Sequence, residues 1–383
     1  MASLADLPPD LELLSRLARV SHEDGPPPGG VSSAELEGAV ETAHAHNTLG
    51  VLLPALRRGG RLLPNALEAR LAAAEPALVA QALFRESGLE EVLRVLARAD
   101  VEVAVLKGAF LASCVYGDFA ERPMNDFDLF VQGQDLSRAG HALQEAGYAL
   151  EDPRLREEPG GAAHFRSPAG QAVELRHDLT QGTRLRGVVD FPEADMWRRR
   201  RAFSTSSGET LCSLDPTDHL LYLAYHAGML HLFAALIWLL DIDRFVRKFQ
   251  GEVAWDELPP RARRIGCATC LWHGLGLAKQ LLGTPVEDSV LRALKPDRLR
   301  ARLVQRWLTP QTLLRGMTPP RAVRMQALQM LLLDTIAADA RSLWQGLFPP
   351  RQWLQWRYRT SNPLVLLLFR TVYPFGGWAR RRT

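Results

Sequence analysis

The chain has 383 residues, 47% hydrophobic and 23% charged, a composition typical of a globular protein with a sizeable core and room for two domains. Its 46 basic and 43 acidic residues give a net charge of +3, a balance that argues against a nucleic-acid partner. Four scattered cysteines exclude a disulfide framework, and no apolar run reaches the roughly 18 residues of a membrane span. The N-terminus lacks a basic start and an apolar core, so we expect no signal peptide and a cytoplasmic protein.

The first hundred residues are predicted to be helical after a short N-terminal segment. A Pro/Gly-rich stretch ends that segment, which we expect to be flexible over 1–30. Ser33 followed by Glu35 is typical of a helix start, and the pattern of 65–99 predicts one or two further helices. We therefore expect N-terminal helices over 31–100.

Strands and helices alternate through the next part of the chain. The predicted elements are a strand at 102–106, a helix at 109–116, a strand at 126–132, a helix at 135–146, and strands near 163–167 and 171–179. The last two strands flank a Gly-containing turn and predict a hairpin. Residues 101–214 should therefore form a small mixed sheet with helices on one side, and the fold class is predicted to be α+β.

Two aspartates stand at the start of the predicted strand 126–132. Successive side chains of a strand point to opposite faces, so Asp126 and Asp128 share a face while Phe127 and Leu129 point into the protein. Neighbouring carboxylates repel each other, and a divalent cation between them offsets the repulsion. The pair predicts a metal site; the alternative is two solvated acids at an exposed strand end.

A third carboxylate is expected from the strand 171–179. Glu174, Arg176 and Asp178 share its polar face. Glu174 lies nearer the strand start between apolar neighbours, so we predict that it completes the metal site. Asp178 is the alternative third ligand.

Basic and glycine residues near the first strand indicate a phosphate-binding turn. Gly108 at a helix start permits close approach of a phosphate to backbone N–H groups, and Lys107 adds a positive charge. The alternative is an ordinary turn with a solvated lysine. Arg122 is a second candidate cation for phosphate, unless it forms an ion pair with Asp118 or Glu121.

The remainder of the chain, 215–383, is predicted to be a C-terminal helical domain. Proline and glycine break it into lengths that suit a bundle. The breaks fall at Pro259-Pro260, Gly283 to Pro285, Pro296, Pro310, Pro319-Pro320, Pro349-Pro350 and Pro363. Asp241 and Asp243 are two apart on a helix, too far around it to share one ion, and Asp241 is expected to tie the helical domain together.

Other reactive side chains have structural interpretations. Cys267 and Cys270 have the spacing of zinc ligands but no second pair, so we interpret them as core residues. His219 and His226 share a helix face that His231 does not, and all three are interpreted as structural, with a role in lining a substrate cleft as the alternative.

The C-terminus is basic and aromatic. Arginines in 351–359 and 380–382 alternate with Trp353, Trp356, Tyr358 and Trp378. Such a run is usually a solvated helix face, and the aromatic residues leave a membrane-surface or partner-protein contact as alternatives.

Four motifs in order resemble a bacterial family of uncharacterised nucleotidyltransferases, within the superfamily that includes DNA polymerase beta. They are Leu106-Lys107-Gly108 with the helix after it, Arg122-Pro123-Met124-Asn125-Asp126-Phe127-Asp128, the strand Val173-Glu174-Leu175-Arg176-His177-Asp178, and the helical half that begins at Asp215-Pro216. The resemblance covers roughly residues 40 to 290. Arg176 stands where the family commonly has His and His177 where it has Trp, a departure that bears on the acceptor geometry.

The resemblance implies a magnesium-dependent enzyme that moves a nucleotidyl group from an NTP to an acceptor and releases pyrophosphate. Asp126, Asp128 and Glu174 would be its metal ligands and catalytic residues, and Lys107, Gly108 and Arg122 would bind the nucleotide. The acceptor stays open among a small molecule, a sugar, a peptide and a protein side chain. A non-catalytic nucleotide-binding or interaction protein on the same fold, and a related phosphotransferase, are the alternatives.

Overall fold

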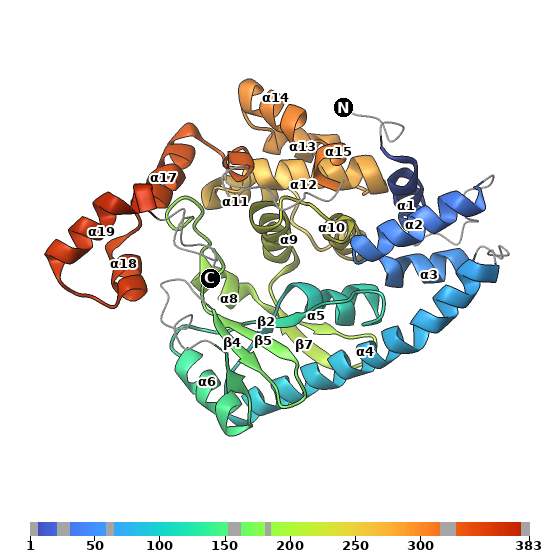
Figure 1. Cartoon of the computed structure of the whole chain (residues 1–383), viewed down its shortest axis with the longest axis horizontal. Helices are drawn as coiled ribbons and strands as arrows, with labels where there is room; N and C mark the ends of the chain where they lie inside the picture. The colour runs from blue at the N-terminus through green and yellow to red at the C-terminus, as the bar shows by residue number, and fades with distance from the viewer. Residues whose placement is uncertain are drawn as a thin grey trace.

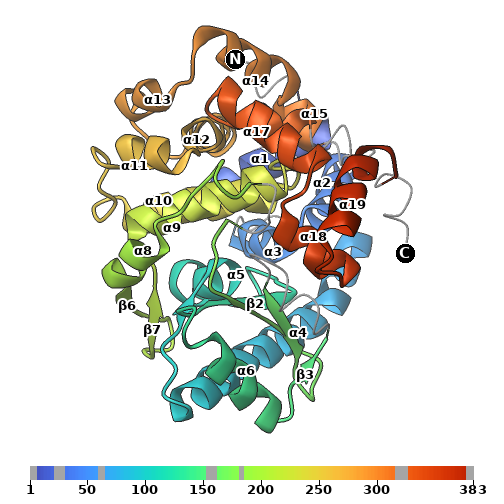
Figure 2. The ribbon, with the colours of Figure 1, turned by 90° about the vertical axis from the view of Figure 1, so that its left-hand side faces the viewer.

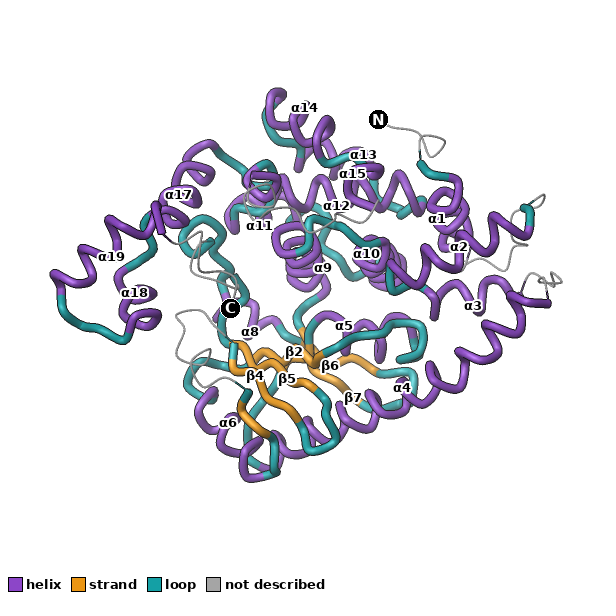
Figure 3. Tube along the Cα trace, viewed as in Figure 1, coloured by secondary structure: helices purple, strands orange, loops and turns teal. Residues whose placement is uncertain are grey.

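The computed structural model describes residues 7–20, 31–58, 65–151, 162–180, 185–314 and 327–376. The fold is α+β, as predicted, with a five-stranded sheet, a separate two-stranded hairpin and many helices (Figures 1 and 3). One continuous hydrophobic core joins the N-terminal helices, the sheet and the C-terminal helices.

The sheet is mixed and has the order β1-β2-β5-β4-β3. Its strands are β1 (Ala104–Val105), β2 (Asp126–Phe130), β3 (Ala149–Leu150), β4 (Ala163–Arg166) and β5 (Ala172–Arg176). Strands β2 and β5 pair in parallel, and the other neighbours pair antiparallel. The predicted hairpin is confirmed as β4–β5, with Gly170 in the left-handed region at φ 93°. Strand β5 ends at Arg176, three residues earlier than the sequence predicts, and the short β3 is not predicted.

Helices cover both faces of this sheet (Figure 2), whereas the sequence predicts helices on one side only. Helix α4 (Asn65–Arg98) is one continuous helix and lies with α6 (Leu136–Glu145) along one face. The fully buried Phe127 points to this face, where its ring lies beside Gly88 of α4. On the other side, α5 (Lys107–Leu111) packs on β2 and continues as the π-helical turn η2 (Ala112–Tyr116). The face of β2 toward α4 is therefore apolar, and its polar face is turned toward α5.

The C-terminal part is helical, as predicted, and the predicted breaks within the described residues separate or begin its helices. After α8 (Glu193–Arg199) and the hairpin β6 (Arg201–Ser204) and β7 (Thr210–Ser213), the helices are α9 (Pro216–Tyr225), η3 (His226–Leu230), α10 (Leu236–Phe249), α11 (Leu258–Ile265), α12 (Ala268–Leu282), α13 (Asp288–Leu294), α14 (Arg298–Trp307), α15 (Pro310–Leu314), α17 (Ile336–Leu347), α18 (Arg351–Tyr358) and α19 (Pro363–Gly376). The break at Pro319-Pro320 lies outside the described residues. No described helix is both long and apolar enough to cross a membrane.

The N-terminal helices are α1 (Pro9–Val20), α2 (Ser33–Ala45) and α3 (Leu49–Arg58). A capping box between Ser32 and Glu35 begins α2, close to the predicted start. Helix α1 lies inside the segment 1–30 that the sequence predicts to be flexible, and here the structure differs. Leu11, Leu14 and Leu17 recur on one helix face and are buried where α1 packs on α2 and α12.

Candidate active site

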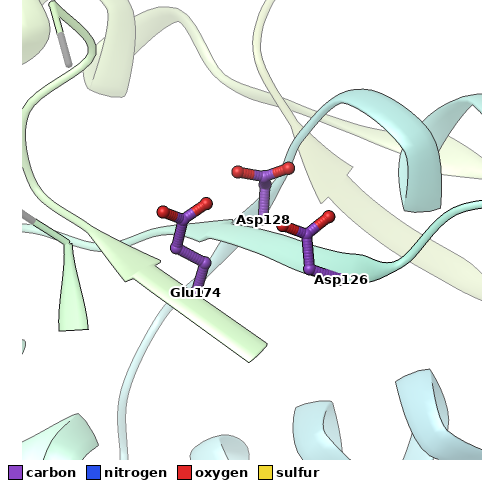
Figure 4. Close-up of side chains that lie close together, drawn as sticks. All are labelled: Asp126, Asp128 and Glu174. Atoms are coloured by element: carbon purple, nitrogen blue, oxygen red, sulfur yellow. The ribbon is translucent and has the colours of Figure 1, made fainter. Parts of the chain in front are cut away.

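Three carboxylates meet on the polar face of β2 and β5 (Figure 4). The parallel register places Asp128 directly beside Glu174, and Asp126 is two residues earlier on the same face of β2. One carboxylate oxygen from each of Asp126, Asp128 and Glu174 lies within 4.8 Å of the others. Oxygen ligands at this spacing fit a hard divalent cation such as Mg²⁺.

Asp178, the alternative third ligand, is engaged elsewhere. It follows the end of β5, accepts a hydrogen bond of 2.7 Å from the backbone N–H of Thr180 and forms an ion pair with Arg186. The early end of the strand therefore removes Asp178 from the face that carries Glu174.

Two buried cations face the carboxylates. Lys107 Nζ lies 2.6 Å from Asp128 Oδ1, and Arg176 Nε lies 3.1 Å from the same oxygen. Arg176 also forms an ion pair with Glu174 through Nη2. Asp126 is the most exposed of the three carboxylates. The cations offset the repulsion among the carboxylates, and they stand where they could also meet an anionic ligand.

The three carboxyl groups have different proton affinities. Burial raises the pKa of Glu174 to about 7, although the Arg176 guanidinium opposes this rise. Burial would also raise the pKa of Asp128, but Lys107 and Arg176 outweigh it and hold that pKa below its usual range. Burial and the neighbouring Asp128 raise the pKa of Asp126. Asp128 is thus held ionised, and Glu174 exchanges its proton near neutral pH.

Lys107 is not the solvated lysine of an ordinary turn. It has a left-handed backbone (φ 45°) at the start of α5, its side chain is buried, and burial lowers its pKa. Its Nζ also lies 3.4 Å from His226 Nδ1. Gly108 packs so closely that an added Cβ would come within 3.1 Å of Met124 Cβ. The Lys-Gly pair therefore brings the chain tightly over the polar face of the sheet.

Arg122 forms an ion pair, but with neither of the predicted partners. Its Nε and Nη2 donate to the two carboxylate oxygens of Asp241 on α10, at 2.6 and 2.7 Å. Its Nη1 donates to the carbonyl of Pro123, and Tyr116 Oη donates to Asp241 at 3.0 Å. Asp241 ties α10 to the sheet region. Three of the five N–H donors of Arg122 are used in these contacts with described residues, which leaves two for a ligand.

A cavity of about 430 Å³ opens in front of the carboxylates. It is lined by Asn47, Lys107, Gly108, Arg122, Pro123, Met124, Asn125, Asp126, Asp128, Glu174, Arg176, His226, Leu230, His231, Ile237 and Trp238. The rings of His231 and Trp238 stack at 4.5 Å, and the His226 ring meets both edge-on. Aromatic rings therefore line the cavity next to its charged side chains, and Arg122 Cζ lies 5.6 Å from the centroid of the Trp238 ring.

The sequence groups His219 with His226 on one helix face, but in the structure His226 lies with His231. His219 is a core residue that packs on Phe110 and lies 3.1 Å from the hydroxyl of Ser213, whereas His226 and His231 both line the cavity. The helical period fails because the chain passes from α9 into the π-helical turn η3 at His226. For these two histidines the cleft-lining alternative describes the structure.

A second cavity of about 300 Å³ adjoins the first beside Asp126 and Glu174. It shares Asn125, Asp126 and Glu174 with the first and extends to residues of β4. Here His164 Nε2 lies 3.2 Å from Glu174 Oε1. Because Asp126 and Glu174 line both cavities, ligands in either cavity could reach these two carboxylates, whereas Asp128 lines only the larger one.

The remaining candidates have structural roles. Cys267 and Cys270 are buried free thiols, and within the described ranges only the three-carboxylate group gathers enough ligands for a metal ion. Asp243 accepts hydrogen bonds from Arg247 and Thr284 and is turned away from the site. Sequence reasoning did not assign Arg176 to the site, although its position two residues after Glu174 on the same strand face is the signal that would have done so.

The comparisons with known proteins agree with the resemblance. A family model described as an uncharacterised nucleotidyltransferase matches residues 32–283, which include all the residues that line the two cavities. No curated protein and no solved structure matches the chain.

Proposed function

The chain belongs to the uncharacterised nucleotidyltransferase family, and from this premise we propose that it is a magnesium-dependent enzyme that moves a nucleotidyl group from an NTP to an acceptor hydroxyl or phosphate. The observation that carries the proposal is the group of Asp126, Asp128 and Glu174 with a carboxylate oxygen of each within 4.8 Å of the others, faced by two buried cations. A bound Mg²⁺ would neutralise charge on the attacking and leaving oxygens of the phosphoryl centre.

We place the nucleotide in the larger cavity. Lys107 and Arg176 supply positive charge for the triphosphate, next to the carboxylates that would hold the metal. Gly108 lets the backbone approach the phosphates closely, and Arg122 offers its two remaining donors. The stacked rings of His231 and Trp238 line the same cavity and offer a flat surface for the base.

We place the acceptor in the smaller cavity. An acceptor oxygen there would attack the α-phosphorus, forming the new P–O bond while the bond to the pyrophosphate oxygen breaks. Glu174 lines both cavities, so its carboxylate would be placed to take the hydroxyl proton of the acceptor. His164 contacts Glu174 from the acceptor side and would orient its carboxylate.

The test uses NTPs labelled separately at the α- and γ-phosphates, incubated with the protein, Mg²⁺ and a small-molecule and peptide extract. Transfer of α-label to a new species, or to the protein itself, with release of pyrophosphate supports nucleotidyl transfer. Transfer of γ-label identifies the phosphotransferase alternative. Magnesium-dependent NTP binding by calorimetry without any transfer identifies the non-catalytic alternative.

Asp126→Asn is the matched control for this assay. The substitution is nearly isosteric and removes one metal-ligand charge, and Asp126 is the most exposed carboxylate of the three, so the fold should survive. We expect magnesium-dependent turnover to fall by roughly a hundredfold or more, with an unchanged circular dichroism spectrum. Full turnover in a natively folded variant would contradict the site.

A further inference from the structure

The charge of this chain is unevenly distributed along the sequence. Residues 340–383 contain eight arginines and no lysine, aspartate or glutamate. In the rest of the chain the other 38 basic residues stand against all 43 acidic ones, so that part is net negative by five. The C-terminal stretch also holds four of the nine tryptophans. A strongly basic, aromatic segment on an otherwise acidic protein indicates an anionic surface as its partner.

Helices α18 and α19 of this stretch pack on each other at the edge of the molecule (Figure 1). The rings of Tyr358 and Phe369 stack at 4.0 Å, and Leu354 and Leu366 are buried. One face of α19 is therefore packed against α18. They hold the two helices together as a unit, which we call the C-terminal hairpin (351–376).

The other side of α19 is apolar and exposed. Leu364, Leu367 and Leu368 are 75%, 60% and 59% exposed. Their spacing of three and four residues puts them on one helix face. Exposed arginines at 351 and 357 lie on the partner helix α18. The hairpin therefore combines an apolar face with cationic side chains.

The preceding helix, α17, also exposes apolar side chains, and an ion pair connects it to the rest of the protein. Helix α17 exposes Ile336, Leu343 and Trp344. It is held by an ion pair of 2.5 Å between Arg300 and Asp339. The hairpin is thus carried by a helix that is itself docked to the rest of the protein.

We propose that the C-terminal hairpin binds the surface of an anionic lipid bilayer. The leucines of α19 enter the boundary between headgroups and acyl chains, and the arginines bind lipid phosphates. Helix α19 has 14 residues, fewer than the roughly 20 that span a bilayer, so it lies in the plane of the surface.

Other occupants fit these features less well. Nucleic acid would satisfy the arginines but leave the three leucines in water. A second copy would bring two net-positive surfaces together, and like charges across an interface oppose association. An anionic bilayer satisfies both the leucines and the arginines.

The experiment is co-sedimentation of the full-length protein with vesicles of phosphatidylcholine alone or mixed with phosphatidylglycerol. We expect binding to the anionic vesicles that weakens as salt rises. Leu364→Ser, Leu367→Ser and Leu368→Ser combined should weaken partitioning by roughly tenfold or more. Arg351→Gln with Arg357→Gln should weaken it by about fivefold for each arginine.

The matched control is Leu83→Ser with Leu299→Ser, which removes two leucines of similar exposure on α4 and α14, outside the hairpin. This variant should bind vesicles as the wild type does. The proposal is overturned if folded wild type stays in the supernatant, or if the leucine variant binds as tightly as the control. It is also overturned if sedimentation velocity shows a dimer that the leucine substitutions dissociate. The same holds if the protein binds duplex DNA but no vesicles, and the leucine substitutions leave the DNA binding unchanged.

Discussion

Lys107 contacts Asp128 in the structure and, in the proposed function, also binds the triphosphate. In the structure its ammonium group is buried against Asp128 at 2.6 Å, so the positive charge is already oriented toward the place where a metal-bound triphosphate would lie. Bringing a second anion to this charge adds attraction without the cost of burying it again. The lysine should therefore distinguish a triphosphate from a monophosphate.

Lys107→Ala should weaken NTP binding by roughly ten- to a hundredfold and NMP binding much less, because a charge-assisted contact to the β- or γ-phosphate is worth about 1.5–3 kcal/mol. Calorimetric titration of both nucleotides against wild type and variant measures the difference. Since the variant also leaves Asp128 with one cation fewer, its melting temperature serves as the folding control. Equal losses for both nucleotides would show that Lys107 only supports the local structure.

The pKa of Glu174 predicts a pH dependence of stability. Its pKa in the folded protein is raised from 4.5 to about 7, so the native state holds this proton more tightly than the unfolded chain does. The resulting stabilisation is complete below about pH 4.5 and is lost as the pH rises through about 7. The lowered pKa of Asp128 puts its titration below this window.

Glu174→Gln removes the titrating group and nearly keeps its shape. Between pH 5 and pH 8 the unfolding free energy of wild type should fall relative to that of the variant by at least about 1 kcal/mol. Urea unfolding of both proteins without divalent ions, across this range, gives the two curves. Parallel curves would mean that the Glu174 pKa is not raised.

Some residues of the site could be predicted from the sequence and others could not, for physical reasons. Alternation along a strand is a local rule, and by itself it predicts that Asp126, Asp128 and Glu174 lie on polar faces. The same rule put Arg176 beside Glu174, but its ion pair with Asp128 depends on a partner 48 residues away. His226 and His231 converge because of a π-helical turn, for which periodicity gives no signal.

At the scale of elements, the parallel register of β2 and β5 builds the site. Asp128 pairs with Glu174, and a slip of one residue would put Val173 or Leu175 in its place. The sequence predicted both strands and the hairpin that returns β5, but not which strands pair in parallel. Helix α1 is not predicted, although its leucine spacing is local, because the proline-rich stretch after it favours a flexible segment.

A buried ion pair connects the sheet region to α10. Arg122 and Asp241 are both buried and share two hydrogen bonds, although they are 119 residues apart. Removing one partner of such a pair leaves an uncompensated buried charge.

Asp241→Asn should therefore lower the unfolding free energy by about 3 kcal/mol, as measured by urea denaturation. The matched control is Asp195→Asn, which breaks an exposed pair with Arg198 and should cost less than about 1 kcal/mol. Arg122→Met combined with Asp241→Leu should recover much of the loss, because no buried charge remains. Similar stability of the two single variants would contradict a structural role for the buried pair.

At the scale of the whole molecule, the larger cavity draws on both sides of the predicted boundary near residue 214. Lys107, Asp126 and Glu174 come from one side, and His226 and Trp238 come from the other. The division into domains stays a prediction, but catalysis as proposed needs both parts together. The helices beyond the family match, which ends at residue 283, contribute to the molecule unequally.

Helices α13 to α15 contribute buried residues to the main hydrophobic core, whereas α18 and α19 lie at the edge of the molecule (Figure 1). Leu294, Val304, Leu308 and Leu313 are buried in the main hydrophobic core. By contrast, Leu354 and Leu366 are the buried apolar side chains of α18 and α19 among those that the structure describes, and neither joins that core.

A chain ended after Phe348 should therefore keep its cooperative melting and its magnesium-dependent NTP binding, whereas a chain ended after Gly283 should lose cooperative melting and aggregate. The second truncation strips several large apolar side chains from the core, at about 1.5–3 kcal/mol each, which is comparable to the whole stability of a typical domain. Thermal melting by circular dichroism and light scattering compare the two with the full chain. Loss of cooperative melting in the chain that ends after Phe348 would mean that the C-terminal hairpin belongs to the folding unit. Cooperative melting of the chain that ends after Gly283 would mean that the site needs only the residues that match the family.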